Sequence, residues 1–119
     1  MPQEEAAAFL RERGQCWLDH LWTEPAMRAF AEAARMHPRL PGVQCAWAIA
    51  SVLDRAVKCF GRAGLFATPA AEVTLPPSEQ PWEPQARPLA IEQLRRIVTN
   101  YQARGLPSAS SSVFMVCQS

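Results

Sequence analysis

Two residues near the start of the sequence have the types and the spacing to bind a metal ion. Cys16 and His20 stand four positions apart, so on a helix both side chains share one face, and thiolate sulfur and imidazole nitrogen are zinc ligands. A structural zinc site takes four ligands, and His37 or Cys45 would have to complete it from elsewhere in the chain. No Cys-x-x-Cys or His-x-x-x-His pair is present. We therefore predict no metal and no cofactor, with buried cysteines acting as small apolar side chains.

The other chemistry that these residue types offer is that of a nucleophilic cysteine. Such a cysteine needs a nearby base and a group that orients the base. Neither of the two histidines stands in a local pattern that connects it to a nucleophilic cysteine. The carboxylates are spread over the expected solvent faces, and the five glycines are isolated instead of forming a phosphate-binding loop. We predict that the chain is not an enzyme.

The charge distribution argues against nucleic acid as a partner. Twelve basic residues stand against eleven acidic ones, whereas a nucleic-acid binder concentrates its basic residues on one face. The connector 37–42 carries two prolines and precedes an apolar helix, so a DNA-reading helix-turn-helix is not expected either. We interpret the densest basic cluster as a solvated helix face, in preference to a contact with an anion or RNA. That cluster consists of Arg87, Arg95, Arg96 and Arg104.

Composition also predicts where the protein works. The first residues are acidic where a secretory signal would be basic, and no apolar run reaches the roughly 18 residues that span a membrane. We predict a cytoplasmic protein without membrane contact, whose thiols stay reduced. Cys45 and Cys59 would lie about 21 Å apart along one helix, too far for a disulfide, which needs Cα atoms within about 7 Å. Arginine greatly outnumbers lysine and alanine is abundant, which indicates a GC-rich bacterial origin.

Hydrophobic periodicity predicts helices along most of the chain. The expected helices cover about residues 2–21, 23–37, 41–60 and 88–104, and Gly14 leaves the continuity of the first one open. Residues 41–60 are apolar over most of the helix circumference, which is typical of a helix in the middle of a bundle. For 119 residues of which 49% are hydrophobic, we predict an all-α fold, a small single-domain bundle of four to five helices. Its core is expected to contain Trp17, Phe30, Trp47, Leu53, Leu94 and Ile97.

A proline-rich segment interrupts the helical pattern between the third and fourth major helices. Residues 67–87 contain five of the eleven prolines, so we predict a long strap within a helical domain of residues 1–107. Pro81, Trp82 and Pro84 place two prolines at PxxP spacing around an aromatic side chain, which is typical of a stiff polyproline segment that binds a partner. The alternative is that Trp82 folds back and caps the apolar end of the bundle, while the prolines stiffen the strap.

A serine-rich linker and an apolar C-terminal tail make up residues 108–119. Exposed apolar runs usually mark contacts. The run here could pack on its own domain, insert into a partner or a twin subunit, or make no contact. We add it to the three strap residues above as a candidate partner-binding site. The run contains Val113, Phe114, Met115 and Val116.

Balanced charge, the lack of a catalytic pattern and two apolar segments outside the helices together indicate binding to another protein. We therefore predict a non-enzymatic bacterial accessory or adaptor protein with a protein partner, as a small subunit of a larger assembly, with a homo-oligomer as a further arrangement. One alternative is a phage-derived or toxin-neutralising inhibitor. Another is a helical bundle that holds a small ligand, a metal ion or a reactive thiol.

Overall fold

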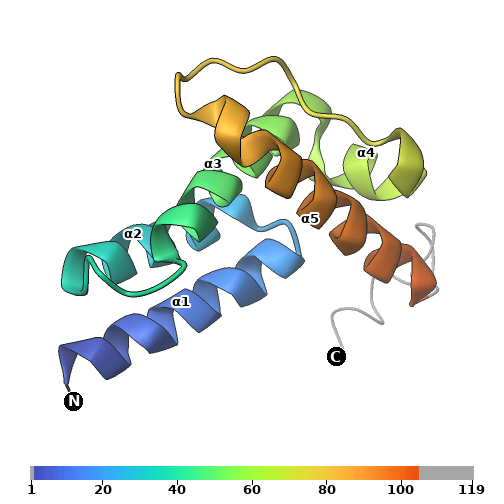
Figure 1. Ribbon diagram of the computed structural model, residues 1–119. Coiled ribbons are helices and arrows are strands. Elements are labelled where there is room, and N and C mark those ends of the chain that lie inside the picture. Colours follow the sequence, from blue (N-terminus) through green and yellow to red (C-terminus); the bar gives the residue numbers. More distant parts are fainter. Residues whose placement is uncertain (1, 105–119) are drawn as a thin grey trace.

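Helices dominate the computed structural model, which describes residues 2–104 (Figure 1). Five α-helices and one short 3-10 turn form a bundle in this part of the chain, so the predicted all-α bundle of four to five helices is confirmed. None of the helices between residues 2 and 104 has the length and apolarity needed to cross a membrane. In chain order the elements are α1 (Gln3–Asp19), α2 (Thr23–Met36), α3 (Val43–Phe60), α4 (Arg62–Ala67), η1 (Ala70–Glu72) and α5 (Glu83–Ala103).

A tight turn at Leu21 joins α1 to α2, which lie side by side (Figure 1). The Trp22 N–H donates to the carbonyl oxygen of Trp17 at 3.0 Å, and the Leu21 N–H donates to that of Leu18 at 2.8 Å. This is the Schellman pattern of helix ends. Leu21 has a φ of 58°, in the left-handed region that glycine usually occupies. Its side chain is buried in the core, and the roughly 1.5–3 kcal/mol gained by burial outweighs the roughly 1–2 kcal/mol lost in the backbone.

Gly14 allows α1 and α2 to approach each other closely. The helix runs through Gly14 without a break. A Cβ atom added there would lie 2.8 Å from Cε1 of Phe30, whose side chain is fully buried. The missing side chain at this position therefore makes the room that the Phe30 ring occupies.

The helix α3 lies at the centre of the bundle, as its apolar pattern predicts. It contacts α1, α2, α4 and α5. Leu53 of α3 is buried together with Phe30 of α2 and with Leu94 and Ile97 of α5, so these four predicted core residues are confirmed. Trp47 is half-buried and packs against the edge of this core.

The prediction that Trp17 lies in the core is wrong. Its side chain is 37% exposed, and its ring lies 5.9 Å from the guanidinium carbon of Arg13. The buried face of α1 is formed by Ala7, Gly14 and Leu18. Because successive residues of a helix are turned by about 100°, the inward position belongs to Leu18 and its neighbour Trp17 faces outward.

The strap is shorter than predicted. The helix α5 begins at Glu83 and not at Pro88, so the strap comprises residues 68–82 and includes η1. Pro84 stands in the first turn of α5, where its missing N–H needs no partner. Pro88 lies inside the helix, where it removes one hydrogen bond of the ladder and its ring crowds the carbonyl of Pro84. The strap leads from α4 back to the start of α5 (Figure 1).

A buried polar contact joins α2 to α3. The hydroxyl of Thr23 donates to Oδ1 of Asp54 at 2.9 Å, and Nζ of Lys58 lies 3.0 Å from Oδ2 of the same carboxylate. The hydrogen bond to Asp54 raises the pKa of the Lys58 ammonium above its ordinary value. The two carboxylate oxygens of Asp54 are thereby both satisfied although the residue is buried.

Candidate functional site

A groove of about 640 Å³ lies between the first half of α3 and the first two turns of α5. On the α5 side the lining residues recur three, four and seven positions apart, which is the spacing of one helix face. We call this feature the α3–α5 groove. It is lined by Gln44, Cys45, Trp47, Ala48 and Ser51 on the α3 side and by Trp82, Gln85, Ala86 and Leu89 on the α5 side.

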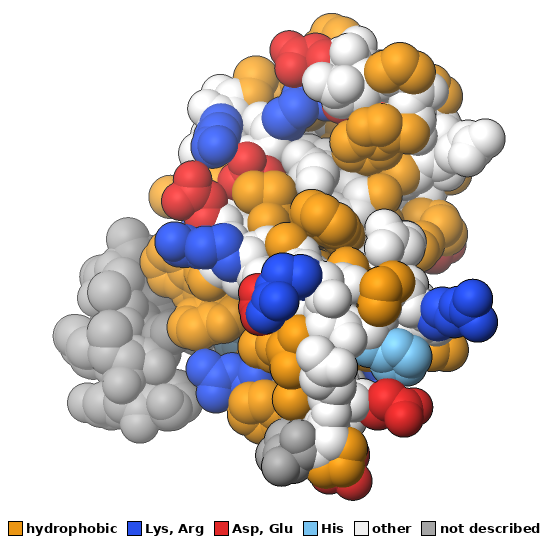
Figure 2. Space-filling model, turned by 90° about the vertical axis from the view of Figure 1, so that its left-hand side faces the viewer, with side chains coloured by type: hydrophobic (Ala, Val, Ile, Leu, Met, Phe, Trp, Pro, Cys, Tyr) orange, Lys and Arg blue, Asp and Glu red, His pale blue; other side chains and the backbone are white. Residues whose placement is uncertain are grey.

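The α3–α5 groove is largely apolar, and none of the residues between positions 2 and 104 that line it is Asp, Glu, Lys or Arg. Trp82 is 42% exposed and Leu89 is also exposed, so both present apolar surface to solvent. The small side chains of Ala48 and Ala86 leave space between the two helices. On the face drawn in Figure 2, hydrophobic side chains reach the surface at many places, with charged side chains between them. The described residues that line the groove include hydrophobic side chains but no charged ones.

The three strap residues of the predicted partner site do not form a polyproline segment. Trp82 has helical backbone angles, φ −85° and ψ −14°, and Pro84 already belongs to α5. Trp82 lines the groove instead of capping the core, whereas Pro81 is exposed in the preceding turn and Pro84 borders a separate pocket on α5. Outside the described residues lie the other four predicted contact residues, Val113, Phe114, Met115 and Val116.

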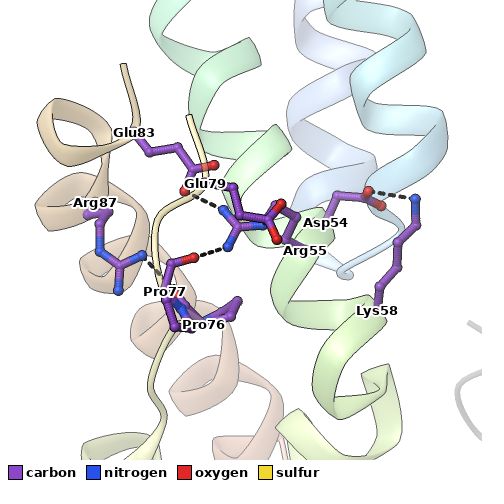
Figure 3. Close-up of polar contacts among 8 residues, drawn as sticks. All are labelled: Asp54, Arg55, Lys58, Pro76, Pro77, Glu79, Glu83 and Arg87. Carbon is purple, nitrogen blue, oxygen red and sulfur yellow. Dashed lines mark hydrogen bonds and ion pairs between the residues drawn. The ribbon is translucent and has the colours of Figure 1, made fainter. Parts of the chain in front are cut away.

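Arg55 of α3 holds the start of α5, next to the groove residue Trp82. Its guanidinium donates to the carboxylate of Glu83 and to the carbonyl oxygen of Pro77, and its Nε lies 3.4 Å from Oε1 of Glu79 (Figure 3). The side chain of Glu83 is only 1% exposed. It stands at the first position of α5, where the helix dipole favours a negative charge. Because Trp82 immediately precedes Glu83, this ion pair holds the backbone of Trp82 against α3.

Two arginines of α5 hold the strap as well. Nη1 of Arg87 donates to the carbonyl oxygen of Pro76 at 2.6 Å, and Nη2 of Arg95 donates to that of Val73 at 3.2 Å. A proline-rich segment lacks many of the N–H groups that would pair in regular structure, so side chains satisfy its carbonyl oxygens instead. Two of the four arginines in the basic cluster that we interpreted as a solvated face thus anchor the strap.

Cys16 and His20 do not assemble a metal site within residues 2–104. Both are exposed, and Nδ1 of His20 lies 3.0 Å from the backbone carbonyl oxygen of Cys16. His37 is near Glu4, with 3.7 Å between Nε2 and Oε2, at the opposite end of α1. In the part of the chain that the structure describes, no three His, Cys, Asp or Glu side chains are grouped as a metal ion requires. All three cysteines in this part are exposed, so the prediction of buried cysteines is wrong for them.

The α3 side of the groove was not predicted from the sequence. Gln44 and Cys45 stand about 40 positions from the residues that they face, and only the fold brings the two walls together. One local signal was available on α5. Leu89 stands three positions before Glu92 and seven before Arg96, so it places an apolar side chain within a polar stripe.

The lining residues supply a thiol, a hydroxyl and two amide groups. The Ser51 hydroxyl donates to the carbonyl oxygen of Trp47 at 2.9 Å. Within the described residues, no His, Asp or Glu lines the groove to act as a base for the Cys45 thiol. The arrangement is therefore suited to bind an apolar group with a few amide hydrogen bonds.

Comparison of the chain with protein-family models, with curated proteins and with solved structures finds no match.

Proposed function

We propose that the protein is a non-enzymatic bacterial accessory or adaptor protein that binds a segment of a partner protein in the α3–α5 groove. The observation that carries this proposal is the exposure of Trp82 and Leu89 along an uncharged groove. Contiguous apolar surface left exposed usually marks a contact. Tryptophan is also enriched among the few residues that dominate the energy of protein interfaces.

The length of the groove supports a peptide segment as its occupant. Trp82 and Leu89 are seven residues apart, which is about 10 Å along a helix. Two turns of a bound helix have about the same length. In helix-in-groove recognition, an amphipathic helix places apolar side chains at i, i+3, i+4 and i+7 in a groove. These side chains have the same spacing as the lining residues on the α5 side. The amides of Gln44 and Gln85 offer hydrogen bonds to its polar atoms.

The rigidity of the groove wall also favours binding. Arg55 ties α3 to Glu83 at the start of α5 and to the strap carbonyl of Pro77. A wall that is already held in place loses little conformational freedom when a partner binds, so less of the contact energy is spent on ordering it.

A small apolar ligand is a second candidate occupant. The observation that favours it is the volume of about 640 Å³, which falls within the range of roughly 300–1,000 Å³ of ligand pockets. A thermal-shift screen with apolar compounds tests this candidate, because a ligand that binds only the folded state raises the melting temperature. A phage-derived or toxin-neutralising inhibitor would use the groove as an adaptor does, and the identity of the partner distinguishes the two.

We also propose that the protein works in the cytoplasm of a bacterium. The cysteines at positions 16, 45 and 59 are exposed and free, and exposed thiols persist in reduced form in a reducing compartment. The excess of arginine over lysine supports the bacterial origin.

Two tryptophan variants test the site. Trp82→Ala removes the groove residue, and Trp22→Ala is the matched control, because Trp22 is 47% exposed but lies at the α1–α2 turn. The partner is identified by mass spectrometry of what co-purifies with the wild-type protein, and binding is then measured with the purified partner. We expect Trp82→Ala to lose about 2 kcal/mol, or roughly 30-fold in affinity, as hot-spot residues do. Equal affinities of the two variants, with unchanged circular dichroism, would contradict the assignment.

A further inference from the structure

The lining residues of the α3–α5 groove and residues 105–119 have one property in common, which is that they include no charged side chain. All twelve basic and all eleven acidic residues of the chain stand before residue 105. In the part of the chain that the structure describes, no charged side chain lines the groove either. A charged segment would lose hydration there without gaining an ion pair, whereas an uncharged apolar segment would not. Residues 113–116 form the apolar run of this uncharged part of the sequence.

The end of α5 lies within reach of the groove. Leu89 stands fourteen residues before Ala103, the last residue of α5, so the two are about 21 Å apart along the helix. The eight residues 105–112 span up to about 26–29 Å when extended. The apolar run that follows them can therefore reach Leu89. Its four residues extend over about 13 Å, enough to cover the wall from Leu89 to Trp82.

We propose that the apolar run of residues 113–116 binds in the α3–α5 groove of its own chain. In an extended run Phe114 and Val116 lie on one face, so Phe114 supplies the bulky apolar group for the space that Ala48 and Ala86 leave open. A short linker gives the run an effective concentration in the mM range at the groove. A weak apolar contact is therefore sufficient for the run to occupy it.

This inference deepens the proposed function, and its regulatory consequence rests on that function. A run that occupies the groove competes with a partner for the same surface. The partner then binds only the open fraction of molecules, and its apparent affinity falls by that fraction. Occupancy of nine-tenths weakens partner binding by about tenfold. Deletion of residues 112–119 is therefore expected to tighten partner binding by the same factor, and weaker binding of the deleted protein would overturn the competition.

Two cysteines make the docking measurable in the purified protein without any partner. Cys45 is exposed and lines the groove, and Cys117 directly follows the apolar run. In the full chain with Cys16→Ser and Cys59→Ser, diamide oxidises these two thiols to a disulfide and takes up the two protons and two electrons. The bond needs Cα atoms within about 7 Å of each other. We expect a disulfide within one chain, detected by mass spectrometry and reversed by a thiol reductant.

The matched control keeps Cys59 and Cys117 and carries Cys16→Ser and Cys45→Ser. Cys59 is exposed near the end of α3 that leads into α4. The end of α5 lies beside α4, because the rings of Phe66 and Tyr101 stack with their centroids 3.9 Å apart. A run without a binding site would therefore meet Cys59 at least as readily as Cys45.

Each outcome of the oxidation decides between occupants of the groove. We expect the bond from Cys45 to Cys117 to form roughly tenfold faster than the bond from Cys59 to Cys117, and Phe114→Asp to abolish the difference. Equal rates would overturn the docking. A disulfide formed only between two chains would overturn it as well and assign the groove to the same run of a second copy. Because no partner is present, a negative result leaves the test of Trp82 with a partner unaffected.

Discussion

Removal of the Glu83 carboxylate is expected to destabilise the fold and disturb the groove wall. In Glu83→Ala, the guanidinium of Arg55 loses its buried carboxylate. Removing one partner of a buried ion pair costs about 3–5 kcal/mol. Arg55 keeps its hydrogen bond to the Pro77 carbonyl oxygen and the nearby carboxylate of Glu79, and its side chain is 21% exposed. We therefore expect the lower end of the range, about 3 kcal/mol, measured by urea unfolding followed by circular dichroism.

Glu79→Ala is the matched control, because Glu79 pairs with the same arginine but is 69% exposed. An exposed ion pair contributes about 0–1 kcal/mol, so this variant should unfold close to the wild-type urea concentration. Glu83→Gln keeps an acceptor for Arg55 without the charge and should fall between the two alanine variants. If Glu83→Ala and Glu79→Ala lost the same free energy of unfolding, burial would not be what gives the Glu83 pair its strength, and the reasoning would be refuted.

Three further substitutions test the packing and the charge contacts of the bundle. Gly14→Ala gains about 1 kcal/mol of helix propensity but overpacks the Phe30 ring at a cost of about 1–3 kcal/mol. Calorimetry should therefore show a lower melting temperature for this variant. In a Phe30→Leu background the same substitution should raise the melting temperature. Leu53→Ala should lose about 2–5 kcal/mol in urea unfolding, because the side chain is fully buried, and a loss below about 0.5 kcal/mol would mean that α3 is misplaced. The hydrogen bond to Asp54 raises the pKa of Lys58 above 10.5. The stabilisation by this pair is therefore complete below that pH and is lost as the pH rises through the raised pKa. Lys58→Met should lessen the fall in unfolding free energy as the pH rises above about 10.5, and an unchanged slope would show that the pair contributes nothing.

The helices and most of the core could be predicted because they depend on local spacing. Phe30, Leu53 and Leu94 recur with the period of a helix whose other face is polar, so their burial follows from the pattern. Trp17 was misplaced because the apolar residues of α1 point in several directions. The pattern then does not decide between two adjacent positions, and the close approach of α2 at Gly14 turns Leu18 inward.

The candidate site could be predicted only in part, because a groove belongs to two helices at once. Trp82 was singled out by the sequence since it stands outside the helical pattern. Its conformation was predicted wrongly, because a PxxP pattern is also compatible with a helix start at which Pro84 occupies the first turn. The pair of Arg55 and Glu83 spans 28 positions, and no local spacing relates two residues so far apart. Cys45 was considered for a metal site and for a disulfide but not for a groove, because its place there depends on the packing of α3 against α5.

The three arginines that hold the strap have a consequence for how the protein responds to its surroundings. Arg55, Arg87 and Arg95 donate to strap carbonyl oxygens, and a guanidinium remains protonated throughout the pH range of living cells. A contact made by a histidine side chain would break on a modest change of pH. A contact made by a desolvated lysine would break in the alkaline range, where the ammonium group loses its proton. Contacts between guanidinium groups and backbone carbonyl oxygens therefore keep the strap on the bundle through changes in cellular pH.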